Sequence, residues 1–304
     1  MTTVSTSAFY ERSSMGMGAL RARAEELQGS IGRGERLTRS SDDPLAASRL
    51  RGLMRADNFS TIDTANANLA SADLGLADSA LSDFSAYTIR AQELAIQAAN
   101  GTLNASQRAA IGQELGLLHG NLVALANSRN SAGQALFGGE TAGQAYALDA
   151  SGNAVYSGTA SAGTLSLGEG LTVGRGITGP DFLNFNHNGV PTNLMAVVKG
   201  LAEALRGGSP DPASAARDAL TALGTGLDTV NAGQTLVGAR LAWIDLTTER
   251  RIDLSELRAG EQADVGGTDI AATVTKLQQV MTVLEASQAS FSKLASLSLF
   301  DNLR

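Results

Sequence analysis

Residues 270–295 read IAATVTKLQQVMTVLEASQASFSKLA, and this stretch carries the most regular pattern in the chain. It contains two lines of residues that return at every seventh position: Ile270, Leu277, Leu284 and Phe291 on one line, and Val274, Met281, Gln288 and Ala295 on the other. The spacings between the two lines alternate between four and three, which is the heptad pattern of a coiled coil. The stretch therefore predicts a long α-helix that packs lengthwise against a partner helix.

Three more apolar residues of the same helix, Val280, Val283 and Leu294, lie outside this heptad. One partner helix buries a single apolar stripe. Apolar residues around more of the helix indicate either that it contacts several neighbours in an assembly or that it is a buried central helix. The pattern alone leaves both open.

The other end of the chain carries a matching but shorter pattern. We predict a helix from about Met15 to Arg33, with one apolar stripe made of Met17, Leu20, Ala24, Leu27 and Ile31. The preceding residues lack a basic start followed by an apolar run, so no secretory signal peptide is expected. The two terminal stripes predict one antiparallel pair of helices.

The segment LTRSSDDPLAAS at 37–48 predicts the start of a second, much longer helix. Asp43 can accept hydrogen bonds from the first free amides, and Pro44 suits the first helical position. We expect this helix to reach about Asn100. Its predicted apolar stripe has two parts that differ in heptad phase by one residue: Phe59, Ile62, Leu69, Leu76 and Ala80, then Phe84, Tyr87, Ala91, Leu94 and Ala98. Asn66 and Asp73 lie on the first part, where polar residues usually set the register of a coiled coil.

Asn104 and Gln107 form a variant capping box for a third helix, expected to end near Phe137 before Gly138 and Gly139. From there to Asn193 the pattern is that of short strands. The hairpin YALDASGNAVYSG comes first, TLSL and LTV follow as strands, and GPDFLNFNHNGVPTN is interpreted as a loop. We expect few contacts between this insert and the helices.

Helical patterns return at Asn193, where a short helix to Arg206 is predicted. After Asp211-Pro212, which repeats the cap-then-proline start, a long helix runs to about Glu261, and DVGGTD separates it from the last helix. Trp243 is interpreted as a core residue of this long helix, and His119 as a half-exposed structural residue of the third.

The predicted fold class is mainly α: a long antiparallel helical coiled-coil bundle formed by the N- and C-terminal segments, with a small β-rich inserted domain. The expected domains are a coiled-coil segment at 1–43, the two halves of the helical bundle at 44–137 and 194–267, the β-rich insert at 138–193, and a C-terminal coiled-coil helix at 268–304.

Composition excludes several classes of function. The chain of 304 residues has a formal charge of −7 and no cysteine, which argues against nucleic-acid binding, disulfides and cysteine metal sites. Its two histidines lie far apart, no phosphate-binding glycine motif occurs, and no apolar run is long enough for a membrane span. We expect no enzyme activity, no cofactor and no metal.

Four segments resemble the flagellin superfamily. LTRSSDDPLAAS at 37–48 is similar to the segment after the first helix in flagellins and their relatives. ALFGGETAGQAY at 135–146, ALDASGNAVYSG at 147–158 and LEASQASFSKLASLSLFDNL at 284–303 resemble the branch of that superfamily that joins hook to filament. Asn302 stands where that branch usually has tyrosine, and the chain has no proline after Pro212, unlike typical flagellin tails.

The resemblance implies a structural subunit at the hook–filament junction, outside the cell. Its implied partners are other copies of itself in a ring of about eleven, another hook-associated protein, flagellin, and the flagellar type III export apparatus with its chaperone. It implies termini that are disordered in the monomer and fold on assembly. The expected subunit-interface residues are Met17, Leu20, Leu27, Ile31, Ile270, Val274, Leu277, Met281, Leu284, Phe291, Leu294, Leu297, Leu299 and Phe300.

Three other hypotheses about the function remain open at this point. The chain resembles flagellin itself, the filament subunit, in its helical ends. Long alanine-rich helices also occur in chemoreceptor-like signalling coiled coils. A third hypothesis is that the β-rich insert binds glycans by stacking sugars on Tyr146, Tyr156, Phe182 and Phe185. Aromatic residues more often pack the core of such an insert.

Overall fold

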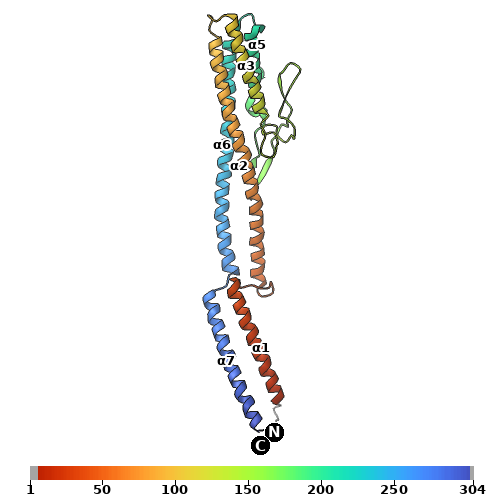
Figure 1. Cartoon of the computed structure of the whole chain (residues 1–304), viewed down its shortest axis with the longest axis vertical. Helices are drawn as coiled ribbons and strands as arrows, with labels where there is room; N and C mark the ends of the chain where they lie inside the picture. The colour runs from red at the N-terminus through yellow and green to blue at the C-terminus, as the bar shows by residue number, and fades with distance from the viewer. Residues whose placement is uncertain (1–5, 302–304) are drawn as a thin grey trace. The chain divides into compact units, whose positions relative to one another are not determined.

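The computed structural model describes the backbone of residues 6–301 and the side chains of residues 8–294. Its helices are shown in Figure 1 and are α1 Thr6–Arg33, α2 Pro44–Ala98, α3 Ala105–Ala126, α4 Gly179–Leu183, α5 Leu194–Glu203, α6 Pro212–Gly266 and α7 Ile270–Asp301. A π-helical turn, η1 Ala204–Gly208, follows α5. The strands are β1 Tyr146–Leu148, β2 Ala154–Tyr156, β3 Thr164–Gly168, β4 Leu171–Gly174, β5 Asn184–His187 and β6 Val190–Asn193. The predicted mainly α fold with a small β-rich region is confirmed.

Contacts divide the chain into two compact units. The terminal unit comprises Met1–Asn58 and Asp253–Arg304, and the central unit comprises Phe59–Ile252. The boundary falls inside α2 and inside α6, so the terminal unit holds α1, α7 and the adjoining ends of these two long helices.

The helix starts follow the local signals in the sequence. Asp43 caps α2 by accepting from the amide of Ala46 at 3.0 Å. Asn104 and Gln107 form the expected capping box of α3, with both reciprocal hydrogen bonds present. Asp211 caps α6 by accepting from the amide of Ser214 at 3.0 Å. These three predictions are confirmed because each cap depends on residues within one turn.

The buried stripe of α2 in the central unit differs from the prediction over its first half. The residues that face the core there are Ala67, Ala70, Leu74, Ala77, Leu81 and Phe84. Of the predicted stripe, Phe59, Ile62, Leu69 and Leu76 are exposed, whereas Ala80 is buried. Both stripes have heptad spacing, and the small alanines allow neighbouring elements to approach α2 closely. From Phe84 onward the predicted phase is correct, with Ala91, Leu94 and Ala98 buried and Tyr87 half-buried.

The two polar residues of the predicted stripe contact the β-rich region instead of setting the register of a coiled coil. The Asn66 side-chain amide donates to the Ser166 carbonyl oxygen at 3.0 Å. Asp73 is buried and forms an ion pair of 3.5 Å with Arg175 of that region, and it also accepts from the side-chain amide of Asn130 at 3.1 Å.

Helix α3 ends at Ala126, eleven residues before the predicted end at Phe137. Its end depends on contacts with distant segments, because the Asn127 side chain exchanges two hydrogen bonds of 2.9 Å with the backbone of Tyr146. The segment after α3 is not helical and places Phe137 in the core. The centroid of the Phe137 ring lies 6.1 Å from that of Phe84 and 4.9 Å from that of Phe182.

The β-rich region is made of three two-stranded antiparallel sheets, β1–β2, β3–β4 and β5–β6. The β1–β2 hairpin and the strands β3 and β4 were predicted and are confirmed, whereas the pairing of β3 with β4 was not predicted. The third is a correction, because residues 179–193 were interpreted as a loop and form α4, β5 and β6. Asn188 and Gly189, with φ of 50° and 78°, make the tight turn between β5 and β6. An Asn-Gly pair suits such a turn because both residues tolerate positive φ.

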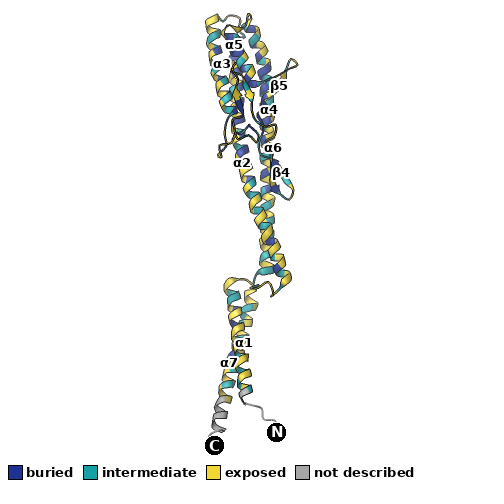
Figure 2. Cartoon of the chain, turned by 90° about the vertical axis from the view of Figure 1, so that its right-hand side faces the viewer, coloured by how far each residue is buried: buried dark blue, intermediate teal, exposed yellow. Residues whose placement is uncertain are grey.

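This region does not pack by itself, so the expectation of few contacts with the helices is wrong. Its buried residues belong to the same core as those of α2, α3, α5 and α6. A β-carbon added at Gly226 would lie 2.8 Å from Leu194, and one at Gly233 would lie 2.8 Å from the β-carbon of Phe182. The two glycines therefore allow α6 to approach these residues closely. Figure 2 shows the buried positions concentrated in the central unit.

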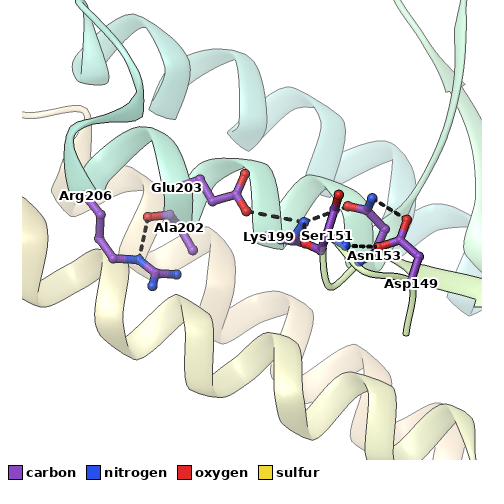
Figure 3. Close-up of polar contacts among 7 residues, drawn as sticks. All are labelled: Asp149, Ser151, Asn153, Lys199, Ala202, Glu203 and Arg206. Carbon is purple, nitrogen blue, oxygen red and sulfur yellow. Dashed lines mark hydrogen bonds and ion pairs between the residues drawn. The ribbon is translucent and has the colours of Figure 1, made fainter. Parts of the chain in front are cut away.

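A lysine on α5 holds the first hairpin of the region against the helices (Figure 3). The Lys199 ammonium donates to the carbonyl oxygen of Ser151 at 2.6 Å and to the side-chain oxygen of Asn153 at 2.7 Å. Asp149 orders the same turn by accepting from the backbone amides of Ser151 and Asn153 at 2.8 Å. The hairpin is thus attached through its tip as well as through the core.

Two single-residue expectations have different outcomes. Trp243 is 41% exposed, so its interpretation as a core residue is wrong. His119 is half-buried on α3, as expected, and burial lowers the pKa of its imidazole, with the Lys199 charge acting in the same direction.

Candidate subunit interface

The terminal unit pairs α1 with α7 in an antiparallel arrangement. Tyr10 near the start of α1 meets Phe291 near the end of α7, with ring centroids 5.3 Å apart and the rings almost perpendicular. At the opposite end of the pair, the Thr268 amide donates to the Gly34 carbonyl oxygen at 2.9 Å. The antiparallel pairing of the two terminal stripes is therefore present within one chain.

This pair buries little of its own apolar surface. Within the described side chains of the terminal unit, the buried apolar residues are Ala24, Leu27, Ala47, Leu53 and Leu284. Two of them, Ala47 and Leu53, belong to α2. The contact between α1 and α7 thus rests on Ala24, Leu27 and Leu284, with half-buried residues around them.

The predicted interface residues fall into four groups. Leu27 and Leu284 are buried, whereas Met17, Leu20, Ile31, Val274, Leu277 and Phe291 are half-buried. Ile270, Met281 and Leu294 are exposed. Leu297, Leu299 and Phe300 lie outside the described side chains. The structure therefore brings the two stripes together but leaves much of their apolar surface open to a further partner.

A groove runs between the two helices. It is lined on α1 by Phe9, Met17 and Leu20, and on α7 by Val283, Phe291 and Leu294. An exposed apolar groove is the surface that a further amphipathic helix buries when it packs against a helix pair.

Sequence reasoning missed the first turns of α1, which begins at Thr6 instead of about Met15. Phe9 and Tyr10 were therefore absent from the predicted interface. A signal was present, because Tyr10, Met17, Ala24 and Ile31 follow one another at intervals of seven residues. Extending the heptad backward would have found Tyr10.

A group of ion pairs and hydrogen bonds holds α2 and α6 together within the terminal unit. Arg49 makes two bonds to the Glu261 carboxylate, of which the Nη2–Oε2 bond is 2.9 Å long. Asp57 accepts from Arg258 and from Gln262 at 2.6 Å. These donors lower the pKa of both carboxyl groups, with Arg258 the larger cause at Asp57 and Arg49 at Glu261.

The connection between α1 and α2 is ordered by two aspartates of the SDDP segment. Asp42 accepts from the backbone and side chain of Thr38 and from the Arg39 amide, and the Arg39 bond is the largest cause of its lowered pKa. The pKa of Asp43 is lowered first by the Ala46 amide and then by Arg36. Arg36 also donates to the Val265 carbonyl oxygen at 3.0 Å, which ties this connection to the end of α6.

No cluster of three or more metal-ligating side chains occurs among the described residues, and none of the helices in this part of the chain is long and apolar enough to cross a membrane. His187 contacts Asp218 at 3.0 Å on the surface, far along the chain from His119. The arrangement as a whole is suited to packing against other helices.

Comparisons with known proteins agree with this geometry. Residues 4–142 match the family model described as the bacterial flagellin N-terminal helical region. Over 97% of its length the chain is 24% identical to flagellar hook-associated protein 3 of Escherichia coli, of which 98% is covered. The chain is thus similar to members of the flagellin superfamily. Its resemblance to that superfamily, first seen in four short segments, thus extends along nearly the whole chain.

Solved structures of flagellar proteins share the fold. A putative flagellar hook-associated protein from Vibrio parahaemolyticus superposes with a TM-score of 0.68 at 21% identity, covering 74% of this chain and 100% of that one. The flagellar junction protein of Legionella pneumophila superposes with a TM-score of 0.59 at 16% identity, covering 72% of this chain and 99% of that one.

Proposed function

We propose that this chain is a structural subunit of the bacterial flagellum that forms the junction between hook and filament. The observation that carries the proposal is the similarity to hook-associated protein 3 over 97% of the chain and 98% of that relative, which includes both terminal helices and the β-rich region. We propose a structural role and no enzymatic one. The location that follows is the flagellum, outside the cell.

The α1 and α7 pair is the proposed interface with neighbouring subunits. Its open groove and its exposed Ile270, Met281 and Leu294 support this. A helix pair that functions as part of a monomer would expose less apolar surface to water. We propose that segments 1–43 and 268–304 are disordered in the free monomer and become ordered when a neighbour covers them.

The proposed partners follow from the junction role. Copies of this chain form a ring of about eleven, which contacts another hook-associated protein on the hook side and flagellin on the filament side. The subunit reaches this position through the flagellar type III export apparatus, together with a chaperone.

Labelling isolated hook–basal bodies with a gold-conjugated antibody against this chain tests the proposal. We expect a narrow band at the tip of the hook. Cells that lack the chain should make hooks and secrete flagellin into the medium without retaining filaments. Label along the length of filaments would contradict the junction role.

The alternative of a filament subunit predicts different self-association. A filament interface never closes, so the purified protein would extend into long polymers. For a junction subunit we expect no long filaments, even at high protein and salt concentrations with seeds of its own fragments. Electron microscopy of the purified protein therefore separates the two functions.

The glycan-binding alternative loses support from burial. Tyr146, Phe182 and Phe185 are buried in the core, and Tyr156 is half-buried with its hydroxyl donating to the Thr159 carbonyl oxygen at 2.7 Å. Rings enclosed by other side chains cannot stack on a sugar. The aromatic residues of this region instead pack its core, which is the more common role of such residues in a small insert.

A further inference from the structure

Within the terminal unit, α2 and α6 carry opposite charge on the sides that face away from each other. On α2 the residues turned toward α6 are Leu50, Leu53 and Asp57: Leu50 lies against Gly266, Leu53 is buried, and Asp57 binds Arg258. At 100° per residue, Gly52 and Arg55 lie about half a turn away from these, on the outer side.

This outer side of α2 is basic. Arg51 and Arg55 are exposed, and neither forms an ion pair with any described residue; Arg51 makes one hydrogen bond of 3.3 Å to the Ser40 hydroxyl. Beside them Met54 is 56% exposed. We call Arg51, Gly52, Met54 and Arg55 the basic face.

The outer side of α6 is acidic. Arg258, Gln262 and Gly266 face α2, so Asp253, Gly260 and Asp264 lie about half a turn away. With Glu256 and Leu257 these residues line a shallow groove, in which Leu257 is 70% exposed. We call Asp253, Glu256, Leu257, Gly260 and Asp264 the acidic face.

Pairing within the chain leaves both faces with unbalanced charge. Arg49 is paired with Glu261 and Arg258 with Asp57, so the charges between the two helices neutralise one another. What remains is arginine on one outer side and three carboxylates on the other, and none of these three forms an ion pair within the described residues. Each face also offers one exposed apolar side chain, Met54 or Leu257, which a contact would bury.

We propose that the basic face of one copy docks onto the acidic face of the next. Each contact between neighbouring subunits thus joins two different faces, which is a heterologous, or head-to-tail, contact. The occupant of the groove is thus a second copy of this chain. Complementary charge on two different sides of one molecule favours a heterologous contact, which repeats around a ring until it closes. This inference rests on the proposed function, because it requires that copies assemble next to one another.

The lack of cysteine in the chain allows a direct test by cross-linking. Gly52 lies on the basic face and Gly260 on the acidic face, and a β-carbon added at either glycine meets open space. The Gly52→Cys/Gly260→Cys variant is expressed in cells that lack the natural protein, and isolated flagella are treated with a short bis-maleimide. We expect a ladder of covalent oligomers beyond the dimer on immunoblots.

The single variants and a matched pair provide the controls. Gly52→Cys alone and Gly260→Cys alone should remain monomeric, because a head-to-tail contact never brings the same face of two copies together. Gly52→Cys/Gly120→Cys, with the second cysteine on α3 where a β-carbon also meets open space, should give no ladder. Dimers from a single variant, or no ladder from a variant that is present in flagella at the wild-type level, would overturn the inference.

Charge exchange gives a second measurement. Arg51→Glu/Arg55→Glu should remove most of the chain from flagella, and adding Asp253→Arg/Glu256→Arg to the same chain should restore it, because the two faces are again complementary. Normal incorporation of the first variant, or no restoration by the second, counts against the proposed contact. Absence of the wild-type chain from flagella would instead contradict the proposed function.

Discussion

The terminal and central units are built from the same long helices but bury very different cores. In the central unit, Phe84, Phe137 and Phe182 are fully enclosed, and residues from helices and strands share one core. In the terminal unit, α1 and α7 enclose little more than Ala24, Leu27 and Leu284. Because apolar burial is the main favourable contribution to folding, the central unit has the means to fold alone. The pair of α1 and α7 encloses too little apolar surface to gain a comparable contribution from its own contacts.

The largest expected effect comes from removing residues 270–304. Without α7, α1 loses its partner, so we expect the truncated chain to be absent from isolated flagella on immunoblots. The central unit keeps its core, and the truncated protein should therefore remain soluble and unfold cooperatively by circular dichroism. Aggregation of the purified truncated protein would mean that the two units do not fold independently.

Two phenylalanines of α2 sharpen the comparison. Phe84 is fully buried and Phe59 is 60% exposed, although both lie on predicted apolar positions of the same helix. Phe84→Ala should lower the free energy of unfolding by about 3–5 kcal/mol. The matched change Phe59→Ala should alter the stability of the monomer by no more than about 0.5 kcal/mol. Urea denaturation of the two variants measures both values, and equal losses would refute the assigned register of α2.

A smaller effect is expected at the attachment of the first hairpin. Lys199→Met removes two hydrogen bonds to the hairpin turn but keeps most of the side-chain volume, so stability should fall by about 1–2 kcal/mol. Amide exchange should quicken around Asn153 in particular. Lys276→Met, at an exposed position of α7, is the matched control and should leave both measurements unchanged. No change at Asn153 in the first variant would show that the core alone holds the hairpin.

The smallest effect is a pH dependence at the start of α2. Hydrogen bonds lower the pKa of Asp42 and Asp43 in the folded chain below the ordinary value of 3.8. Their contribution is therefore complete above pH 3.8 and is lost as the pH falls through the lowered values. Amides near Ala46 should exchange relatively faster at pH 3 than at pH 5 once intrinsic rates are corrected for. The Asp43→Asn variant should reduce this difference, whereas an unchanged difference would assign it to other groups.

Features set by neighbouring residues were predictable from the sequence. The caps at Asp43, Asn104 and Asp211 and the heptad of α7 each depend on a few adjacent positions. The Asn188-Gly189 turn belongs to the same class, and its signal was missed because the surrounding residues were interpreted as a loop. For the candidate interface, the stripes on α1 and α7 were found, and only its first turns with Phe9 and Tyr10 were overlooked.

Features set by distant contacts were not predictable in this way. Helix α2 carries two apolar stripes of equal spacing, and only the elements packed against it decide which one is buried. The end of α3 at Ala126 depends on Asn127 binding Tyr146, nineteen residues later in the chain. The basic and acidic faces likewise emerge only when the pairing of Arg49 and Arg258 shows which charges remain.

Gly226 and Gly233 of α6, which lie against Leu194 and Phe182, have a consequence for the export of the chain. Each glycine weakens an isolated helix by about 1 kcal/mol relative to alanine. Before its neighbours arrive, the middle of α6 is therefore a poor helix, and it becomes a good one only when Gly226 and Gly233 receive these two side chains. A subunit proposed to leave the cell through a narrow channel gains from this, because a segment that stays pliable while it is alone can be threaded and stiffens only at its destination.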